Sequence, residues 1–292
     1  MVSDFEAQVR ATNDKINART GRPLGLALII GIALGLALIA SLIFIKALFM
    51  VFAAILIGFT TFELATAIRA AGRRVPRVPT IIAALAVVPA AFFWLAAGHW
   101  WVTLAGIGFI SLWRLVELVR PGTRSSTKDV LLDLAAGAFV MAYVAFMGAF
   151  TVLLTAQDGG QWWTLAFLIV VVSVDTGAYA SGLAFGKHPM APNISPKKTW
   201  EGFAGSVAAA VIAGILLAIF MLQQPWWVGV ILGVTMVITA TTGDLAESLI
   251  KRDLGIKDIS TWLPGHGGFL DRVDSSLLSA AAAYALFLIF AS

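Results

Sequence analysis

The stretch FAGSVAAAVIAGILLAIFMLQQPWWVGVILGVTMVITATTGDLAESL, residues 203–249, decides the fold class of this chain. It holds two long apolar runs, residues 203–222 and 226–249, joined by a short turn that contains Pro225. Because an α-helix rises about 1.5 Å per residue and the hydrocarbon core is about 30 Å thick, about 20 apolar residues cross a membrane. Each run meets this length, so the stretch predicts two membrane-spanning helices.

The rest of the chain has the same apolar character over much of its length. Of its 292 residues, 60% are hydrophobic and 12% are charged, whereas about one quarter of the residues of a soluble domain are charged. The apolar runs predict nine spans, at residues 24–44, 48–68, 80–97, 101–119, 130–155, 163–184, 203–222, 226–249 and 273–291. We therefore expect an all-α polytopic membrane protein, with a polar segment at residues 1–22, one membrane domain at 23–292, and its catalytic half at about 170–292.

The basic residues predict how these spans are oriented. Lys and Arg favour cytoplasmic loops, and 19 of the 20 lie on one side of the predicted spans, with Lys46 as the exception. This distribution predicts a multi-pass protein of the plasma membrane with a cytoplasmic N-terminus, an external C-terminus and its chemically rich loops in the cytoplasm. The net charge of +4 comes from short loop clusters and not from one basic face, so no nucleic-acid partner is expected. The absence of cysteine excludes thiolate catalysis and thiolate-bound zinc.

Several acidic residues lie inside or at the ends of the predicted spans. An unpaired charge at such a position is costly, so these side chains need partners and are candidates for function. They are Glu63, Glu117, Asp133, Asp175, Asp244 and Glu247.

Residues 243–274 carry the densest set of chemically useful side chains. Asp271 and Asp274 are three residues apart and would share one face of a helix. Asp244 could complete a cluster of three carboxylates, the hard oxygen ligands that suit Mg²⁺ together with substrate phosphates. The alternative is a solvated charged loop, but a mere connector needs no acidic residues at both membrane borders.

Basic side chains and a glycine-rich segment lie in the same stretch as these carboxylates. Lys251, Arg252, Lys257 and Arg272 could bind phosphate oxygens. The sequence PGHGG at 264–268 could expose backbone N–H groups to an anion, through Gly267 and Gly268 among others. We assign His266 to substrate binding and not to catalysis, because an anionic phosphate nucleophile needs little help from a base.

A second polar stretch, residues 175–202, is also predicted to be cytoplasmic. Ser195, Lys197, Lys198 and Thr199 precede an expected helix that begins near Glu201 or Phe203. A helix N-terminus with lysines readily binds phosphate, although a polar N-cap beside positive-inside lysines would look the same. Asp175 is either half of an ion pair within the bundle or a ligand for nucleotide or metal.

These two stretches resemble the CDP-diacylglycerol synthases, also called phosphatidate cytidylyltransferases. The C-terminal signature of that family is matched by Ser248, Ile250, Lys251, Arg252, Lys257, Asp258, His266, Gly267, Gly268, Asp271, Arg272, Val273 and Asp274. Family segments are also matched by SPKKTWEG at 195–202, by GDLAES at 243–248, and by Asp175 with Ala178, Tyr179 and Gly182. The close likeness covers about residues 175–275.

The resemblance implies a Mg²⁺-dependent attack of the phosphatidate phosphate on the α-phosphorus of CTP, with loss of pyrophosphate. It also implies a polytopic homodimer in the bilayer. Asp244, Asp271 and Asp274 would hold Mg²⁺, with room for a second cation, and Lys251 and Arg252 would act on the phosphates. The remaining matched polar residues would bind substrate, Lys197 and Lys198 with CTP.

Two other functions compete with this one. A CTP-dependent enzyme acting on another lipid, such as a polyprenol kinase or an ether-lipid synthase, would share part of the signature. An ion-coupled transporter would also carry carboxylates within its spans, but it should show matched broken helices in two halves, and the sequence has none. Because the tails of phosphatidate stay in lipid, we expect a cleft that opens sideways to the bilayer.

Overall fold

The computed structural model describes residues 35–119, 126–260 and 267–291. A short apolar helix, Gly35–Phe44, precedes the longer elements. These are α3 (Lys46–Ala70), α4 (Arg77–Phe93), α5 (Leu95–Glu117), α6 (Thr127–Val140), the π-helical turn η1 (Met141–Phe146), α7 (Met147–Ala156), α8 (Gly160–Phe185), β1 (Pro189–Ala191), β2 (Ser195–Thr199), α9 (Trp200–Phe220), α10 (Trp226–Asp253) and α11 (Leu270–Phe290).

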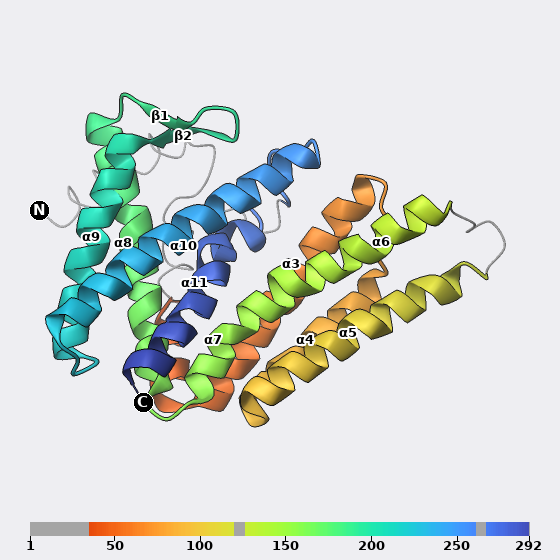
Figure 1. Ribbon diagram of the computed structural model, residues 1–292, viewed down its shortest axis with the longest axis horizontal. Helices are drawn as coiled ribbons and strands as arrows, with labels where there is room; N and C mark the ends of the chain where they lie inside the picture. Colours follow the sequence, from red (N-terminus) through yellow and green to blue (C-terminus); the bar gives the residue numbers. More distant parts are fainter. Residues whose placement is uncertain (1–34, 120–125, 261–266, 292) are drawn as a thin grey trace, which may run out of the picture.

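The helices form two groups that lie side by side (Figure 1). One group holds α3 to α7, and the other holds α8 to α11 with a small hairpin of β1 and β2 at one end. Each group has its own cluster of buried apolar side chains. Helix α11 contributes to both clusters, with Leu277 in the first and Ala283 in the second. It therefore joins the two halves of the molecule.

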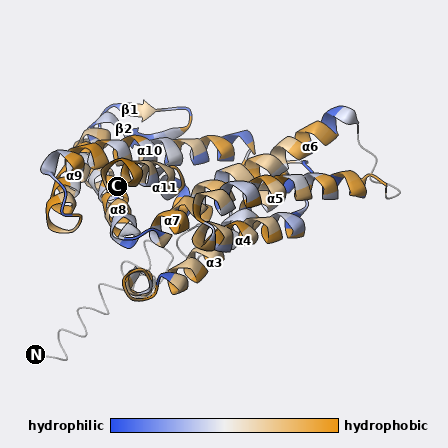
Figure 2. Ribbon diagram, turned by 60° about the horizontal axis from the view of Figure 1, so that its bottom comes forward, coloured by the Kyte–Doolittle hydropathy of each residue, from blue (hydrophilic) through white to orange (hydrophobic). Residues whose placement is uncertain are grey.

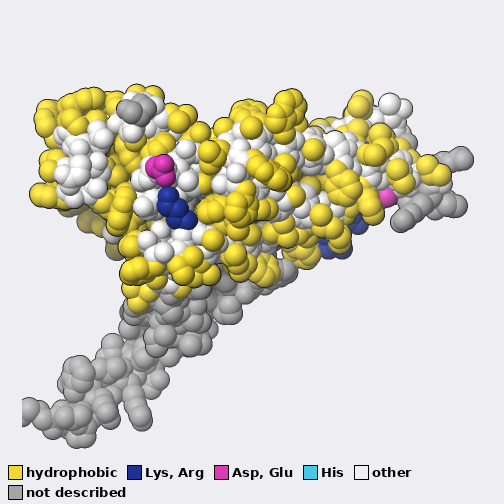
Figure 3. Space-filling model, turned by 90° about the horizontal axis from the view of Figure 1, so that it is seen from below, with side chains coloured by type: hydrophobic (Ala, Val, Ile, Leu, Met, Phe, Trp, Pro, Cys, Tyr) yellow, Lys and Arg dark blue, Asp and Glu magenta, His cyan; other side chains and the backbone are white. Residues whose placement is uncertain are grey.

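Seven of the described helical segments are long and apolar enough to cross a membrane. They are α3, α5, the continuous segment Thr127–Ala156, α8, α9, α10 and α11. Figure 2 shows apolar residues over most of their length, and Figure 3 shows one face covered largely by hydrophobic side chains. The protein is thus a multi-pass all-α membrane protein, as predicted.

The predicted total of nine spans stays a prediction. Residues 1–22 and 24–34 lie outside the described residues, so the first span is seen only as Gly35–Phe44. Helix α4 has 17 residues and an internal proline, Pro89, and falls short of the length of the other spans. The orientation of the two termini is likewise untested.

Two predicted boundaries were wrong. The predicted span 80–97 runs past the end of α4, because the chain turns at Trp94 and Leu95, where Leu95 has a φ of 51°. This turn contains neither glycine nor proline at its centre, so the sequence gives no local signal of a turn there. The last helix begins at Leu270 and not at residue 273, which places Asp271 in its first turn.

The predicted polar stretch after α8 contains strands that the sequence analysis did not foresee. β1 and β2 pair in antiparallel fashion, with Pro189 opposite Thr199 and Ala191 opposite Ser195. The helix expected after this stretch is present, since Thr199 caps α9 by accepting a hydrogen bond from the N–H of Gly202. The hairpin therefore holds its lysines directly before a helix N-terminus.

Small residues bring the helices of the second group close together. A Cβ on Gly205 of α9 would lie 1.9 Å from the Oγ of Ser181 in α8. A Cβ on Gly243 of α10 would lie 2.5 Å from the backbone oxygen of Asp274 in α11. Only glycine permits these approaches, and the second one sets Asp244 and Asp274 on adjoining turns of neighbouring helices.

Two charged residues of the first group have structural partners. The guanidinium of Arg114 in α5 donates to Oδ2 of Asp133 in α6 through Nε and Nη2, at 3.0 and 2.8 Å. The N–H of Arg74 donates to Oδ1 of the same carboxylate, at 2.8 Å. Lys46, the basic residue on the predicted outer side, donates from Nζ to the backbone oxygen of Gln157. Asp133 was a functional candidate because of its position in a span, but its contacts with Arg114 and Arg74 give it a structural role, linking α6 to α5 and to the residues after α3.

Replacing Asp133 by asparagine is expected to lower the free energy of unfolding by about 3 kcal/mol, because it removes the negative charge from a buried ion pair with Arg114. The two side chains are 3% and 1% exposed, so water cannot replace the lost partner. Thermal unfolding in detergent measures the change. A melting temperature equal to that of the wild type would show that this pair adds no stability.

Candidate active site

A cavity of about 650 Å³ opens among α8, the β-hairpin, α9, α10 and α11. Its walls hold carboxylates from three helices and cations from the hairpin, α10 and α11. The charged lining residues are Asp175, Lys197, Lys198, Asp244, Glu247, Lys251, Asp271, Arg272 and Asp274. An apolar bundle thus concentrates charge of both signs around one hollow.

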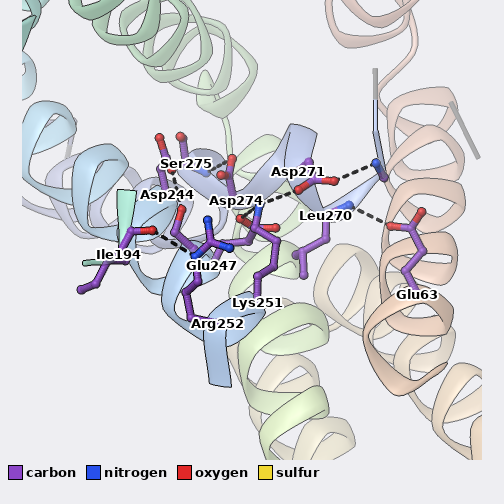
Figure 4. A network of polar contacts seen from close by, with 12 residues as sticks. Glu63, Ile194, Asp244, Glu247, Lys251, Arg252, Leu270, Asp271, Asp274 and Ser275 are labelled. Atoms are coloured by element: carbon purple, nitrogen blue, oxygen red, sulfur yellow. Dashed lines mark hydrogen bonds and ion pairs between the residues drawn. The ribbon is translucent and has the colours of Figure 1, made fainter. Parts of the chain in front are cut away.

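Lys251 is the centre of the polar network in this cavity (Figure 4). Its Nζ lies 2.5 Å from Oε2 of Glu247, one helical turn earlier in α10, and 2.8 Å from Oδ1 of Asp271 in α11. The Glu247 side chain is 1% exposed, and its Oε1 has no hydrogen-bond partner among the described residues. The ammonium of Lys251 therefore ties α10 to α11 and neutralises part of a strongly acidic wall.

The start of α11 presents both of its aspartates to this network. Oδ2 of Asp271 accepts the N–H of Gly268 at 2.8 Å, which closes the first turn of the helix. Asp274, one turn later, accepts the N–H of Ser275 at 2.6 Å. Gly267 adopts a φ of 77°, and a Cβ there would lie 2.9 Å from Oδ2 of Asp271, so glycine is required beside this carboxylate.

The β-hairpin covers the cavity from the other side. Nζ of Lys198 lies 2.5 Å from Oδ2 of Asp244, which links β2 to α10. Glu201 in the first turn of α9 accepts the backbone N–H groups of Lys187 and His188 and also contacts the ring of His188. These contacts fix the strand that carries Lys197 and Lys198 over the carboxylates.

Asp175 lies on the α8 wall and makes neither an ion pair nor a hydrogen bond among the described residues. It is within electrostatic range of Asp244 and of Lys198. The sequence left two roles open for Asp175, an ion pair within the bundle or a ligand for nucleotide or metal. Among the described residues, Asp175 forms no ion pair. The carboxylate is free to meet a cation or a hydrogen-bond donor that enters the cavity.

The structure brings most of the sequence-predicted residues together, but not all of them. Thr199 lines the cavity, and Ser248 donates a long hydrogen bond to Asp244 at 3.4 Å. Arg252 donates to the backbone oxygen of Ile194 at 3.4 Å, outside the cavity lining. Five more predicted residues are described but lie outside the lining: Ser195, Lys257, Asp258, Gly267 and Gly268. His266 lies outside the described residues.

Two acidic residues, one in the cavity lining and one that contacts the start of α11, were not assigned to the site from the sequence. Glu247 was noted only as a buried acid, although it lies three residues after Asp244 and four before Lys251, on one helical face. Glu63 belongs to α3, far away in the sequence, and contacts the start of α11. Helical spacing could have revealed Glu247, whereas no local signal points to Glu63.

The carboxylate oxygens of the cavity suit a hard cation, but in this structure they do not form a complete coordination shell. Within the described ranges, no three acidic or histidine side chains converge on one point closely enough to hold a metal. Asp244 and Asp271 are each turned toward a lysine instead. Mg²⁺ commonly uses one or two carboxylates and completes its shell with water and substrate phosphate. The residues fit that mode of binding.

These features define a class of protein, a polytopic membrane protein with a charged cavity among its helices. Residues 26–290 match the cytidylyltransferase family, and the chain belongs to this family. It is therefore a nucleotidyltransferase, which sets the transporter alternative aside.

Similar proteins have related names. The chain is 40% identical to the phosphatidate cytidylyltransferase of Mycobacterium bovis over 276 residues, covering 91% of this chain and 89% of that protein. It is 38% identical to the enzyme of the same name from Mycobacterium leprae over 285 residues, covering 93% and 90%. The match to the Brucella suis enzyme of that name is 42% over 158 residues, covering 54% and 57%.

Proposed function

We propose that this protein transfers CMP from CTP to phosphatidic acid and releases pyrophosphate, which yields CDP-diacylglycerol for phospholipid synthesis. The observation that carries the proposal is the cavity in which Lys198, Lys251 and Arg272 face the carboxylates of α8, α10 and α11. The likeness to three phosphatidate cytidylyltransferases supports the choice of substrates.

The reaction forms one P–O bond and breaks another. An oxygen of the phosphatidate phosphate attacks the α-phosphorus of CTP, and the bond from that phosphorus to the β-phosphate oxygen breaks as pyrophosphate leaves. Such a transfer needs in-line positioning and neutralisation of charge more than it needs a base. Lys197 and Lys198 would bind the triphosphate, and Lys251 and Arg272 would neutralise charge as pyrophosphate departs.

Asp244, Asp271 and Asp274 would hold Mg²⁺, with Asp175 available for a second cation. A metal held there would supply neutralisation of negative charge on the substrate phosphates. The remaining work belongs to side chains of the protein. Asp271, held by Lys251 and by the N–H of Gly268, would keep its place while substrate enters.

The lipid would reach the cavity from the side. Tyr179 and Leu183 line the cavity on α8, and these side chains are 74% and 77% exposed. In a bilayer, exposed apolar side chains of a spanning helix face lipid tails. Phosphatidate would therefore place its tails along this face of α8 and its phosphate in the cavity. A homodimer in the plasma membrane, with the cavity on the cytoplasmic side, completes the proposal.

Purified protein tests the reaction directly. Labelled CTP, phosphatidic acid and Mg²⁺ are expected to give a labelled lipid that extracts into chloroform, together with pyrophosphate. Parallel reactions with a polyprenol or with an archaeal-type ether lipid provide the comparison. Product from one of those lipids, with none from phosphatidic acid, would contradict the substrate and leave the nucleotide-transfer class intact.

Replacing Lys198 by alanine is expected to raise the KM for CTP by about tenfold and to change kcat less, because the side chain binds phosphate in the ground state as well as the transition state. Steady-state kinetics with varied CTP measures the effect. Lys187→Ala is the matched control, since the Lys187 side chain is exposed and takes no part in the cavity. Equal KM values for the two variants would remove Lys198 from nucleotide binding.

A further inference from the structure

Glu63 is a buried acid in α3 whose contacts lead out of its own helix group. Its side chain is 2% exposed, and the residue is not part of the cavity lining. Burying a carboxylate among apolar helices is costly unless its oxygens receive hydrogen bonds. The groups that donate hydrogen bonds to Glu63 therefore show which parts of the chain it holds in place.

Both oxygens of Glu63 bind residues that border the active site. The hydroxyl of Ser260 donates to Oε1 of Glu63. The N–H of Leu270 donates to Oε2 at 3.0 Å. Ser260 and Leu270 are ten residues apart and lie on either side of residues 261–266, so one carboxylate anchors both flanks of that stretch.

The contact with Leu270 falls at the first residue of α11. A negative charge is stabilising at a helix N-terminus, where free N–H groups and the helix dipole point outward. The same junction has two further contacts with α3. The ring of Phe59 stacks on that of Phe269 with centroids 4.8 Å apart, and a Cβ on Gly268 would lie 3.0 Å from Oε2 of Glu63. One face of α3 thus fits closely against the start of α11.

The start of α11 sets the positions of the site aspartates. Asp271 follows Leu270 directly, and Asp274 lies one turn later. Figure 4 shows Glu63 reaching this turn from one side while Lys251 and Glu247 of α10 approach from the other. The first turn of α11 is therefore held between a carboxylate of α3 and an ammonium of α10.

We propose that Glu63 is a positioning residue for the transfer reaction, holding the first turn of α11 so that Asp271 meets Lys251 and Asp274 faces the cavity. This inference rests on the proposed function for its kinetic consequence, but the hold on α11 stands on the contacts alone. It gives the helix group α3–α7 a direct part in the active site, although the charged cavity lining comes from the other group.

Glu63→Gln is the test variant, because it keeps the volume and one acceptor oxygen. Its amide oxygen can still accept from the N–H of Leu270 and its NH₂ group can donate to the hydroxyl of Ser260, but the variant loses the negative charge that stabilises the N-terminus of α11. Losing a residue that orients a ligand-bearing element costs about 10- to 100-fold in activity. We expect kcat to fall by about that factor and the KM for CTP to stay within about threefold, because Glu63 touches no substrate.

Asp133→Asn is the matched control, since Asp133 is another buried acid of the same helix group whose partners lie away from the cavity. Measured on folded protein well below each melting temperature, its kcat is expected to stay within about threefold of wild type, as for independent sites. Ser260→Ala should reproduce part of the kcat loss. The double variant Glu63→Gln/Ser260→Ala should lose less than the product of the two single losses.

Amide hydrogen exchange supplies a readout that does not depend on catalysis. Exchange in the peptide that contains residues 270–274 is expected to speed up in Glu63→Gln and not in Asp133→Asn, with α8 unchanged in both. Unchanged exchange at α11 would overturn the inference even if activity fell. Faster exchange with full kcat would overturn the positioning role. Wild-type protein inactive on phosphatidate would refute the proposed function, while the exchange result would still decide the contact.

Discussion

Asp271→Asn is expected to lower kcat for CMP transfer by about 10²- to 10³-fold, the usual cost of removing one fixed electrostatic group from a reacting centre. The side chain keeps its size but loses its charge, and its new NH₂ group must face either Lys251 or the N–H of Gly268. Both of those groups are donors that the carboxylate now accepts, at 2.8 Å each. Label transfer from CTP to phosphatidic acid measures the loss.

Asp253→Asn is the control for this variant. Asp253 ends α10 and is exposed, and it takes no part in the cavity. Its kcat is expected to remain within about threefold of wild type, as for surface substitutions away from a site. If Asp271→Asn retained comparable activity, the assignment of Asp271 to the reaction would fail. Thermal unfolding of both variants shows whether any loss reflects folding.

Lys251→Met is expected to lower the free energy of unfolding by about 3–5 kcal/mol, because it leaves the charge of Glu247 buried without its cation. Glu247 is 1% exposed, and Lys251 lies 2.5 Å from it. The double variant Glu247→Gln/Lys251→Met should recover part of this stability, since it removes the lysine together with the more deeply buried of its two carboxylate partners. Unfolding in mixed micelles, followed by circular dichroism, measures all three proteins.

The recovery distinguishes two explanations for a destabilised Lys251→Met protein. If the double variant were as unstable as the single one, the cause would be lost packing of the lysine stem or loss of the ion pair with Asp271, and not the buried charge of Glu247. Both variants should lack activity, because Lys251 also contacts Asp271. Their relative stability therefore has to be measured independently of turnover.

Local sequence predicted most of the helices and most of the charged cavity. Apolar runs long enough to cross a bilayer identify α8, α9 and α10 within a few residues. The hydrocarbon core holds no water to hydrogen-bond backbone N–H and C=O groups, so such a run forms a continuous helix that pairs these groups internally. The three-residue spacing of Asp271 and Asp274 predicted that both lie on one face of a helix. The lysines that precede α9 predicted a site for an anion at its N-terminus.

The features that the sequence did not predict depend on contacts between distant residues. The turn at Trp94 has no glycine or proline, and the short strands β1 and β2 gain their order from pairing and from Glu201. Glu63 is separated from Leu270 by 207 positions, so no periodicity within one segment can relate them. The same holds for Lys198 and Asp244, which come from different elements.

Helix α11 has a consequence for the order of events during synthesis. It packs against both buried clusters and carries Asp271 and Asp274, yet it follows every other described helix along the chain. A nascent protein that has inserted α3 to α10 therefore lacks two of the five cavity carboxylates and the helix that joins its halves. The charged cavity is therefore complete only after this last helix has been synthesised and inserted.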